Sequence, residues 1–460
     1  MRKRLTTLLL TASVLAISSW FASTAKAGPP DPELLADINQ DTADSDAAYA
    51  PVVTGGIAFF GANDGRQGDE LWKSDGTGAG TVMVKDINPG SGHSYPDNFT
   101  VMGGLVYFAA DDGTHGVELW VSDGTEAGTQ MVKDINGGGS AELDELTVVG
   151  NTLYFAATDG SHGEELWKSD GTAGGTVMVQ NLNGSQDSFG GELVAFNSGV
   201  FFPADDGTHG EELWKSDGTG TGTQMVKDIN PGSDGSNPGP LTVAGSQLFF
   251  GADDGSHPGA LWVSDGTKTG TNMVKDIDST DGYDLGELHS MGGQLYFGGS
   301  ENVHGTELWR SDGTLTGTVM VKDIQPGPRG SLPRYFYADG TTLYFQANDG
   351  TTGTELWKSD GTITGTTLVK DIYAGAPDSE PDGFHAFGGD IFFAADDGSH
   401  GDELWKTDGT NSGTVMVQDI YSGALPSDPS PTVILDNSLL LAADDGSVGD
   451  EVWTTDGSSS

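Results

Sequence analysis

The stretch Glu70-Leu71-Trp72-Lys73-Ser74-Asp75-Gly76-Thr77 recurs along this chain with small changes. Its tryptophan returns every 47 or 48 residues, at Trp72, Trp120, Trp167, Trp214, Trp262, Trp309, Trp357, Trp405 and Trp453. So constant a period indicates one supersecondary unit copied in tandem, and units of about 40 to 50 residues made of short strands are typical of propeller blades. A residue present in every copy is expected to hold neighbouring units together and not to perform one reaction.

One copy predicts four antiparallel strands over residues 146–149, 153–157, 165–168 and 176–182, separated by Gly and Asp-Gly turns. Glycine interrupts every stretch before a helix could form. The strands carry apolar groups on both faces, as in Leu153, Tyr154 and Phe155, so both faces must be covered. We therefore expect each sheet to pack between two others, with the tryptophans as the core between blades.

The two ends of the chain complement each other. The ninth copy stops at Ser460 without its last strand, which elsewhere resembles the stretch from Met83 to Ile87. Residues 34–39, which belong to no copy of their own, match that missing strand. We predict an all-β fold: a single closed propeller of about nine four-stranded blades, with residues 34–39 completing the ninth. An open array of sheets is the alternative.

The pattern Glu-Leu-Trp-x-Ser-Asp-Gly-Thr-x-x-Gly-Thr recurs over essentially the whole chain after residue 27. The sequence therefore resembles the bacterial family named for its ELWxxDGT repeats. The resemblance implies secreted or cell-surface β-propeller proteins and brings no assigned reaction. This chain departs from the motif locally: Ala260 replaces the glutamate, and Thr407 and Thr455 replace the serine.

The first 27 residues are typical of a secretory signal peptide. Arg2, Lys3 and Arg4 precede an apolar run, and Ala25-Lys26-Ala27 offers a cleavage site. The propeller would occupy residues 28–460, and no later segment approaches the roughly 20 apolar residues of a membrane span, so no membrane insertion is expected. The sequence predicts that the protein is exported, to the periplasm, the cell surface or the extracellular space.

The mature chain is strongly acidic. It keeps 16 basic residues against 68 acidic ones, a formal net charge of 16 minus 68, or −52. Nucleic acid is excluded as an expected partner, because phosphate contacts need clustered Lys and Arg. A surface of this kind favours cations, or it keeps an exported protein soluble through mutual repulsion.

Acidic pairs recur in the loop between the second and third strands. Calcium takes six to eight oxygens, often from successive Asp side chains, so these loops are candidate calcium sites and calcium is the candidate cofactor. The alternative is that the carboxylates bond local N–H groups in tight turns. A histidine that follows the loop in six copies is expected to brace the turn. The candidate metal ligands are Asp111, Asp112, Asp205, Asp206, Asp253, Asp254, Asp396, Asp397, Asp444 and Asp445.

Function in a repeat fold is expected on the connections that are not repeated. Tyr95 and Tyr283 stand in two of them, and aromatics beside polar groups suit sugar or peptide binding. Arg329, Arg334 and Tyr335 belong to the only locally basic loop, which is the preferred contact for an anionic group. These five are the candidate ligand-binding residues.

The leading hypothesis is a secreted binding or scaffold propeller that engages a protein or glycan through one ring face, with calcium as an assisting ion. The alternative is an extracellular hydrolase or lyase that uses carboxylates such as Asp112 or Asp206 at the mouth of the central channel. That chemistry would need one carboxyl group with a raised pKa.

Overall fold

Each repeat forms one four-stranded antiparallel sheet in the computed structural model, which describes residues 32–40, 44–45, 51–277 and 285–458. Blades 1 to 3 consist of Val52–Thr54 (β2), Ile57–Asn63 (β3), Asp69–Ser74 (β4), Val82–Lys85 (β5); Asp97–Met102 (β6), Leu105–Asp111 (β7), Val117–Ser122 (β8), Gln130–Lys133 (β9); Asp144–Val149 (β10), Thr152–Thr158 (β11), Glu164–Ser169 (β12), Val177–Met178 (β13).
Blades 4 to 6 consist of Val194–Phe196 (β14), Gly199–Asp205 (β15), Glu211–Ser216 (β16), Gln224–Lys227 (β17); Gly239–Ala244 (β18), Gln247–Ala252 (β19), Ala260–Ser264 (β20), Asn272–Lys275 (β21); Leu288–Met291 (β22), Gln294–Glu301 (β23), Gly305–Ser311 (β24), Val319–Lys322 (β25).
Blades 7 to 9 consist of Arg334–Asp339 (β26), Thr342–Asn348 (β27), Thr354–Ser359 (β28), Thr367–Lys370 (β29); Asp382–Phe387 (β30), Asp390–Asp396 (β31), Asp402–Thr407 (β32), Val415–Gln418 (β33); Ser430–Leu435 (β34), Ser438–Asp444 (β35), Asp450–Thr455 (β36), with Glu33–Ala36 (β1) as the fourth strand of blade 9.

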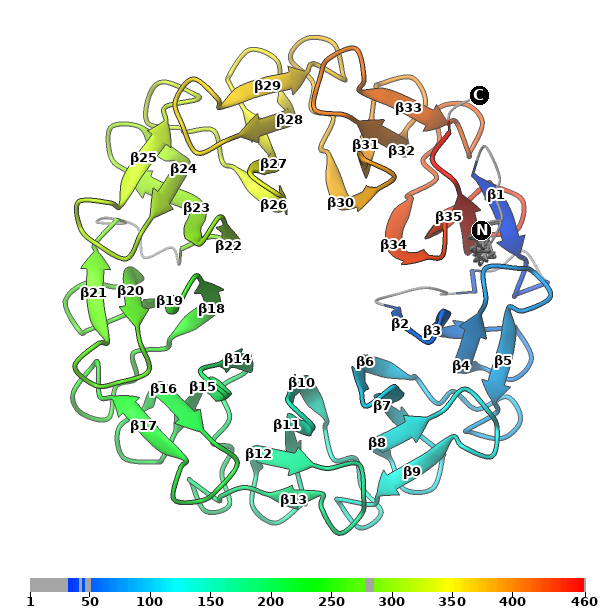
Figure 1. The fold of residues 1–460 in the computed structure, drawn as a ribbon, viewed down its shortest axis with the longest axis vertical. Helices are drawn as coiled ribbons and strands as arrows, with labels where there is room; N and C mark the ends of the chain where they lie inside the picture. The colour runs from blue at the N-terminus through cyan, green and yellow to red at the C-terminus, as the bar shows by residue number, and fades with distance from the viewer. Residues whose placement is uncertain (1–31, 41–43, 46–50, 278–284, 459–460) are drawn as a thin grey trace, which may run out of the picture.

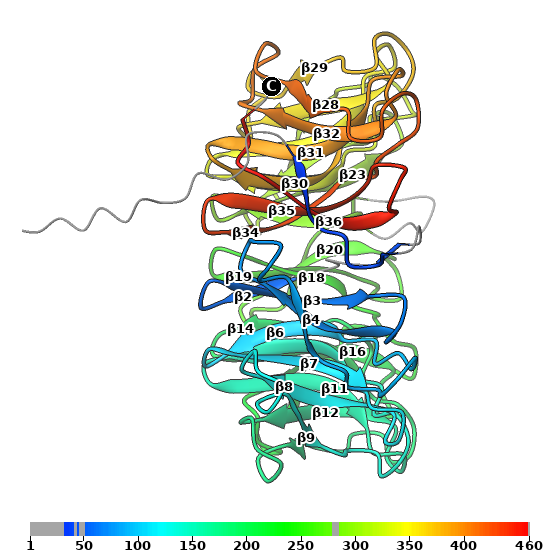
Figure 2. The ribbon, with the colours of Figure 1, turned by 90° about the vertical axis from the view of Figure 1, so that its right-hand side faces the viewer.

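The nine blades stand around one axis, as Figure 1 shows. The first strand of each blade lies innermost and the fourth outermost, and the strands run between the two ring faces seen edge-on in Figure 2. The loop between the second and third strands and the connection to the next blade therefore leave the sheet at the same face, which we call the connection face. The other face carries the remaining turns. The nine-bladed propeller and this arrangement of loops confirm the sequence prediction.

The N-terminal strand closes the ring, as the matching ends predicted. Leu34 of β1 pairs with Trp453 of β36 in antiparallel register. Beyond β1, the N–H groups of Ile38 and Asn39 donate to the two carboxylate oxygens of Glu451 at 2.8 and 3.0 Å. The edge of blade 9 is thereby covered by a segment more than 400 residues away in sequence.

The tryptophans form the core between blades, which confirms their predicted role. Trp167 of blade 3, for example, packs in one buried cluster with Tyr107, Leu119 and Val132 of blade 2. The second strands are buried on both faces: Val106 and Phe108 of β7 pack in a cluster with blade 1, and Tyr107 between them packs in a cluster with blade 3. At roughly 25 cal/mol per Å² of apolar surface, such burial stabilises the ring only when the neighbouring blade is present.

Lysines join each of blades 1 to 8 to the blade that follows it, a role that the sequence did not indicate. The Lys73 ammonium donates to the carbonyl of Gly124 in the following blade at 2.7 Å. Lys85 donates to the carbonyl of Thr129 at 2.7 Å and lies 5.4 Å from the ring centre of Trp120. A cation over an indole face is worth roughly 0.5–2 kcal/mol. The repeated lysines therefore serve the framework.

The fourth strand of blade 3 is shorter than the 176–182 predicted, because β13 spans only Val177–Met178. The Val179 N–H still donates to the Leu166 carbonyl at 2.8 Å, so the pairing extends one bond further. The described residues contain no helix long and apolar enough to cross a membrane. The predicted signal peptide, residues 1–27, lies outside the described residues.

Candidate functional site

At eight junctions of the described residues, the connection on the connection face is held between two blades. The Ser94 N–H donates to the Asp69 carbonyl of blade 1 at 2.8 Å, and the Ser94 carbonyl accepts from the Asp111 N–H of blade 2 at 2.9 Å. The same carbonyl bond to the next blade forms at eight junctions, through Ser45, Ser94, Ala141, Ser188, Ser236, Ser331, Ser379 and Ser427. The connections are thus fixed parts of the ring.

The motif glutamates are buried beneath these connections. Glu403 accepts hydrogen bonds from the N–H groups of Ile420 and Tyr421 at 2.8 and 3.3 Å and from the Ser427 hydroxyl at 2.8 Å. Burial raises the pKa of Glu403 to about 7, although these hydrogen bonds act to lower it. Eight such side chains are fully inaccessible: Glu70, Glu118, Glu165, Glu212, Glu307, Glu355, Glu403 and Glu451.

Sequence reasoning recognised these glutamates only as part of the motif. The signal that could have located them is the recurrence of Ile or Leu 17 residues further on, since it is that residue's N–H that the carboxylate binds. The carboxylate holds the start of the connection against the third strand. Blade 5 has Ala260 instead, as the sequence indicated.

The acidic pairs lie where the sequence placed them, each within its own turn. One Asp112 oxygen accepts from the N–H groups of Thr114 and His115 at 2.9 Å, and the other lies 2.8 Å from the Nδ1 atom of His115. Asp111 accepts from the Gly113 N–H at 2.7 Å. The same pattern is present at Asp205 and Asp206, Asp253 and Asp254, and Asp396 and Asp397, while Asp444 and Asp445 repeat it without a histidine. The turn-bracing role of the histidines is confirmed.

These turns leave few oxygens for a cation. Each loop offers fewer free carboxylate oxygens than the six to eight that calcium takes. Within the described ranges, no group of three or more His, Asp or Glu side chains is arranged to hold a metal ion. Calcium binding by these loops stays a prediction.

The carboxylates named for the hydrolase alternative have the wrong electrostatics for an acid. Burial acts to raise the pKa of Asp112, but the hydrogen bonds from His115 and Thr114 outweigh it, so the pKa lies below its ordinary value. Asp206 has a lowered pKa for the same reasons, with His209 as the partner. A general acid needs a raised pKa. Both groups are therefore ionised turn residues held by their histidines.

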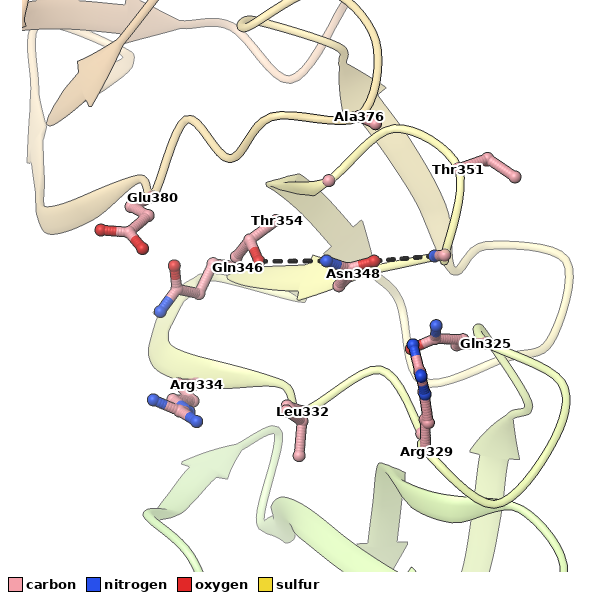
Figure 3. Close-up of a pocket in the computed structure, with 13 residues that line it drawn as sticks. Gln325, Arg329, Leu332, Arg334, Gln346, Asn348, Thr351, Thr354, Ala376 and Glu380 are labelled. Atoms are coloured by element: carbon pink, nitrogen blue, oxygen red, sulfur yellow. Dashed lines mark hydrogen bonds between the residues drawn. The ribbon is translucent and has the colours of Figure 1, made fainter.

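The structure brings two of the five candidate ligand residues into one cavity. Arg329 and Arg334 line a cavity of about 590 Å³ at the junction of blades 6, 7 and 8, together with Gln346 and Glu380 (Figure 3). Tyr335 lines an adjoining cavity of about 450 Å³ that shares Leu332 and Arg334 with the first.

Of the two remaining candidate tyrosines, the described one lines neither of these cavities. Tyr95 lies at the junction of blades 1 and 2, where it is 61% exposed and stacks on His93 with 5.1 Å between ring centres. Tyr283 lies outside the described residues.

Blade 7 departs from the repeat at the wall of this cavity. Arg334 pairs across the sheet with Gln346, whereas the equivalent pairs include Asp97 with Ala109 and Asp382 with Ala394. Gln346 is only 6% exposed, and its Oε1 atom has no hydrogen-bond partner. Sequence reasoning missed Gln346. The signal was present, because the other eight copies carry Ala, Gly or Pro at this position: Gly61, Ala109, Ala156, Pro203, Gly251, Gly298, Ala394 and Ala442.

Strained residues directly follow several of the serines, and Ala141, whose carbonyls bond the next blade; we call these connection residues the clamped serines. Tyr95, Leu332 and Glu380 have φ values of 46°, 50° and 46°, a left-handed region that costs a side-chain-bearing residue roughly 1–2 kcal/mol. Glu142, Asn237 and Asp428 occupy the same position in other blades with similar φ values. The left-handed backbone thus recurs at six junctions of the described residues, while the side chains it carries vary and only Glu occurs twice. Such strain tends to cluster at functional sites.

No protein-family model matches the sequence, and no curated protein matches it. Among solved structures, a puromycin hydrolase is similar over 76% of this chain and 58% of its own, with 13% identity and a TM-score of 0.38. Oligopeptidase B from Leishmania major is similar over 72% of this chain and 50% of its own, with 13% identity and a TM-score of 0.44. Sqt1 from Saccharomyces cerevisiae is similar over 79% of this chain and 96% of its own, with 11% identity and a TM-score of 0.43. The chain therefore spans little more than half of the first of these proteins, and the likenesses carry no argument about its function.

Proposed function

We propose that this protein is an exported binding or scaffold propeller that engages a protein or glycan through its connection face. One observation carries the proposal: the repeated polar groups are used by the framework, whereas the side chains after the clamped serines vary among the blades. The buried glutamates, the turn aspartates and the lysines all have partners within the ring. Tyr95 and Leu332 instead stand 61% and 46% exposed on a backbone that holds them rigidly.

A paired set of surface variants tests which face binds. The connection-face variant is Tyr95→Asn with Leu332→Asn and Glu380→Asn, because Asn tolerates the left-handed backbone and already occupies the position at Asn237. The opposite-face control is Leu315→Asn with Ile363→Asn, two side chains that are 65% exposed in the turns between third and fourth strands. A panel of glycans and extracellular proteins would be measured against the unaltered mature protein and both variants.

We expect the connection-face variant to lose at least about tenfold in affinity for any partner that the unaltered protein binds, and the control to retain it. Truncation of a few central contacts commonly costs 1 kcal/mol or more each, and 1.4 kcal/mol is tenfold. The opposite pattern, with binding lost only in the control, would overturn the proposal.

The assisting role proposed for calcium is tested separately. Calcium is titrated calorimetrically into chelator-treated mature protein while the melting temperature is followed. Saturable heat and a raised melting temperature would support a metal-dependent connection face, because a ligand that binds only the folded state stabilises it. No heat and no shift would leave the Asp111 and Asp112 type of loop as a plain turn.

A further inference from the structure

The cavity at the junction of blades 6, 7 and 8 carries two cationic groups that the framework does not use. In contrast to the lysines, which donate to carbonyls of the next blade, Arg329 and Arg334 form no ion pair with any carboxylate of the described residues. They lie on the same wall of the cavity, on either side of Leu332, as Figure 3 shows. On a chain with a formal net charge of −48, two unpaired guanidinium groups in one cavity favour an anionic ligand group.

Gln346, a buried neutral side chain, stands between the two arginines and the opposite wall of the cavity. Gln346 projects into the cavity, with Arg334 below it and Glu380 above it in Figure 3. Its Oε1 atom is buried without a partner, and an unsatisfied buried acceptor costs about 1–3 kcal/mol. The framework therefore leaves the amide oxygen of Gln346 without a role.

Four departures from the repeat meet in this one place. Arg329 stands where other connections have Gly92, Gly139, Gln186, Asp234, Pro377 or Leu425. Arg334 faces Gln346 where other blades have Asp, Gly or Ser facing a small residue. Gln325 stands where Asn88 and its counterparts bond the connection. Several departures from the repeat at one cavity are what a ligand site built on a repeated framework would produce.

The shape and chemistry of the cavity favour an acidic sugar. Guanidinium groups bind a carboxylate bidentately, while Gln346 and Glu380 offer partners to hydroxyl groups. The adjoining cavity adds an apolar surface at Pro333 and Tyr335, on which a sugar ring can lie. Each volume falls within the range of roughly 300–1,000 Å³ that is usual for small-ligand sites.

Two other ligand classes fit less well. An extended peptide commonly adds a strand to a free sheet edge, but β27 at this cavity is already paired with β26 and β28. A dianionic phosphate would meet Glu380 within the cavity and the acidic field of the whole chain. A carboxylate, with a single charge, meets less repulsion.

We propose that this cavity binds a carboxylate-bearing sugar, a uronate unit of an oligosaccharide, through Arg329, Arg334 and Gln346. The inference rests on the proposed function, whose ligand class it names. The two arginines contact the carboxylate oxygens, Gln346 donates from its amide NH2 group to a hydroxyl oxygen, and Tyr335 supports the ring of the neighbouring unit.

The test is calorimetric titration of trigalacturonate into the mature protein, with its methyl ester and trialanine as matched probes. The variants are Arg334→Asp and Gln346→Ala, each of which installs the residue that another blade carries at that position, so the fold should tolerate them. Arg329→Gln follows the same logic, since Gln186 occupies that position. The control is Arg310→Lys, which removes an arginine outside the cavity and restores the lysine of the repeat.

We expect the acid to bind at least tenfold more tightly than its methyl ester, and binding to weaken with salt because the charges are partly exposed. Arg334→Asp should weaken it at least tenfold and Gln346→Ala severalfold, whereas Arg310→Lys should change nothing. Equal affinity for acid and ester, or unchanged affinity in Arg334→Asp, would overturn the inference. Tighter binding of trialanine would overturn it too, in favour of a peptide carboxylate.

This outcome can be separated from that of the proposed function. If trigalacturonate fails while another partner is lost in the connection-face variant, the uronate assignment falls and the binding face stands. If partners are lost only in the opposite-face control, the proposed function falls whatever the titration shows.

Discussion

Deletion of residues 33–39 from the mature chain is expected to lower the free energy of unfolding by about 5 kcal/mol or more. Leu35 and Ile38 pack with Phe60 and Val452 in a cluster that spans blades 9 and 1, and burying each such side chain is worth roughly 1.5–3 kcal/mol. The deletion would also leave the buried carboxylate of Glu451 without its two backbone N–H donors. Urea unfolding of the full-length and deleted proteins measures the difference.

The exposed edge of β36 gives this prediction a second readout. An unpaired edge strand is a template for pairing with another chain, so the deleted protein should elute from size exclusion as dimers or larger species. A synthetic peptide of residues 32–40 added in trans should restore the monomer and most of the stability. The same peptide carrying Ile38→Asp is the matched control and should not. If the deleted protein stays monomeric and unfolds at the same urea concentration as the full-length protein, β1 does not close the ring.

The protein is expected to become more stable as the pH falls from 8 to about 5. The buried glutamates have raised pKa values, and the pKa of Glu118, Glu355, Glu403 and Glu451 lies near 7 instead of 4.5 because burial disfavours the charged form. The folded state therefore binds more protons than the unfolded state between these values, and the free energy of unfolding must fall as pH rises through this window. This stabilisation is fully present below about pH 4.5 and is lost by pH 7 and above.

The expected size is large because the effect is repeated. One pKa unit corresponds to about 1.4 kcal/mol, so several glutamates together contribute several kcal/mol. Below about pH 4 the opposite trend begins, since Asp112 and its counterparts have lowered pKa values and lose their stabilisation on protonation. The free energy of unfolding should be greatest near pH 4 to 5. Urea midpoints measured against pH at constant ionic strength test this.

A matched pair of variants separates the buried glutamates from the general charge of the surface. Glu118→Gln removes one buried titrating group, and Glu126→Gln removes the same charge from an exposed turn. The first should reduce the slope of stability against pH between 5 and 7 by up to about 1.4 kcal/mol per pH unit, and the second should leave it nearly unchanged. Equal slopes in the two variants would assign the pH response to surface repulsion instead.

The fold could be predicted because its determinants are repeated or complementary. The spacing of the tryptophans set the blade, and the match of residues 34–39 to the missing strand predicted closure. The role of Glu118 could not be predicted in the same way. Its burial depends on the connection folding back to place the N–H groups of Ile135 and Asn136 against it, 17 and 18 residues later.

The candidate site was predictable only in part. Arg329 and Arg334 stand out on an acidic chain, and only four residues separate them in the sequence. Gln346 is placed beside them by the register of β26 against β27, which a repeat alignment can suggest but a list of loop residues cannot. Tyr95 could have been separated from this group by counting repeats, because it precedes blade 2 whereas Arg334 begins blade 7.

The lysine contacts run in one direction around the ring, from blade 1 to blade 9. Lys73 reaches Gly124, Lys168 reaches Gly218, and Lys406 reaches Gly457, always from one blade to the blade that follows it. Each of the first eight copies thus carries the donor that its successor requires, whereas blade 9 has Thr454 at the position of Lys406 and no lysine of its own. The lysine contacts therefore do not set the number of blades. The number nine is a property of the angle between adjacent sheets and of the position at which the chain supplies β1, so duplication of one unit would change the circumference without creating a new kind of contact.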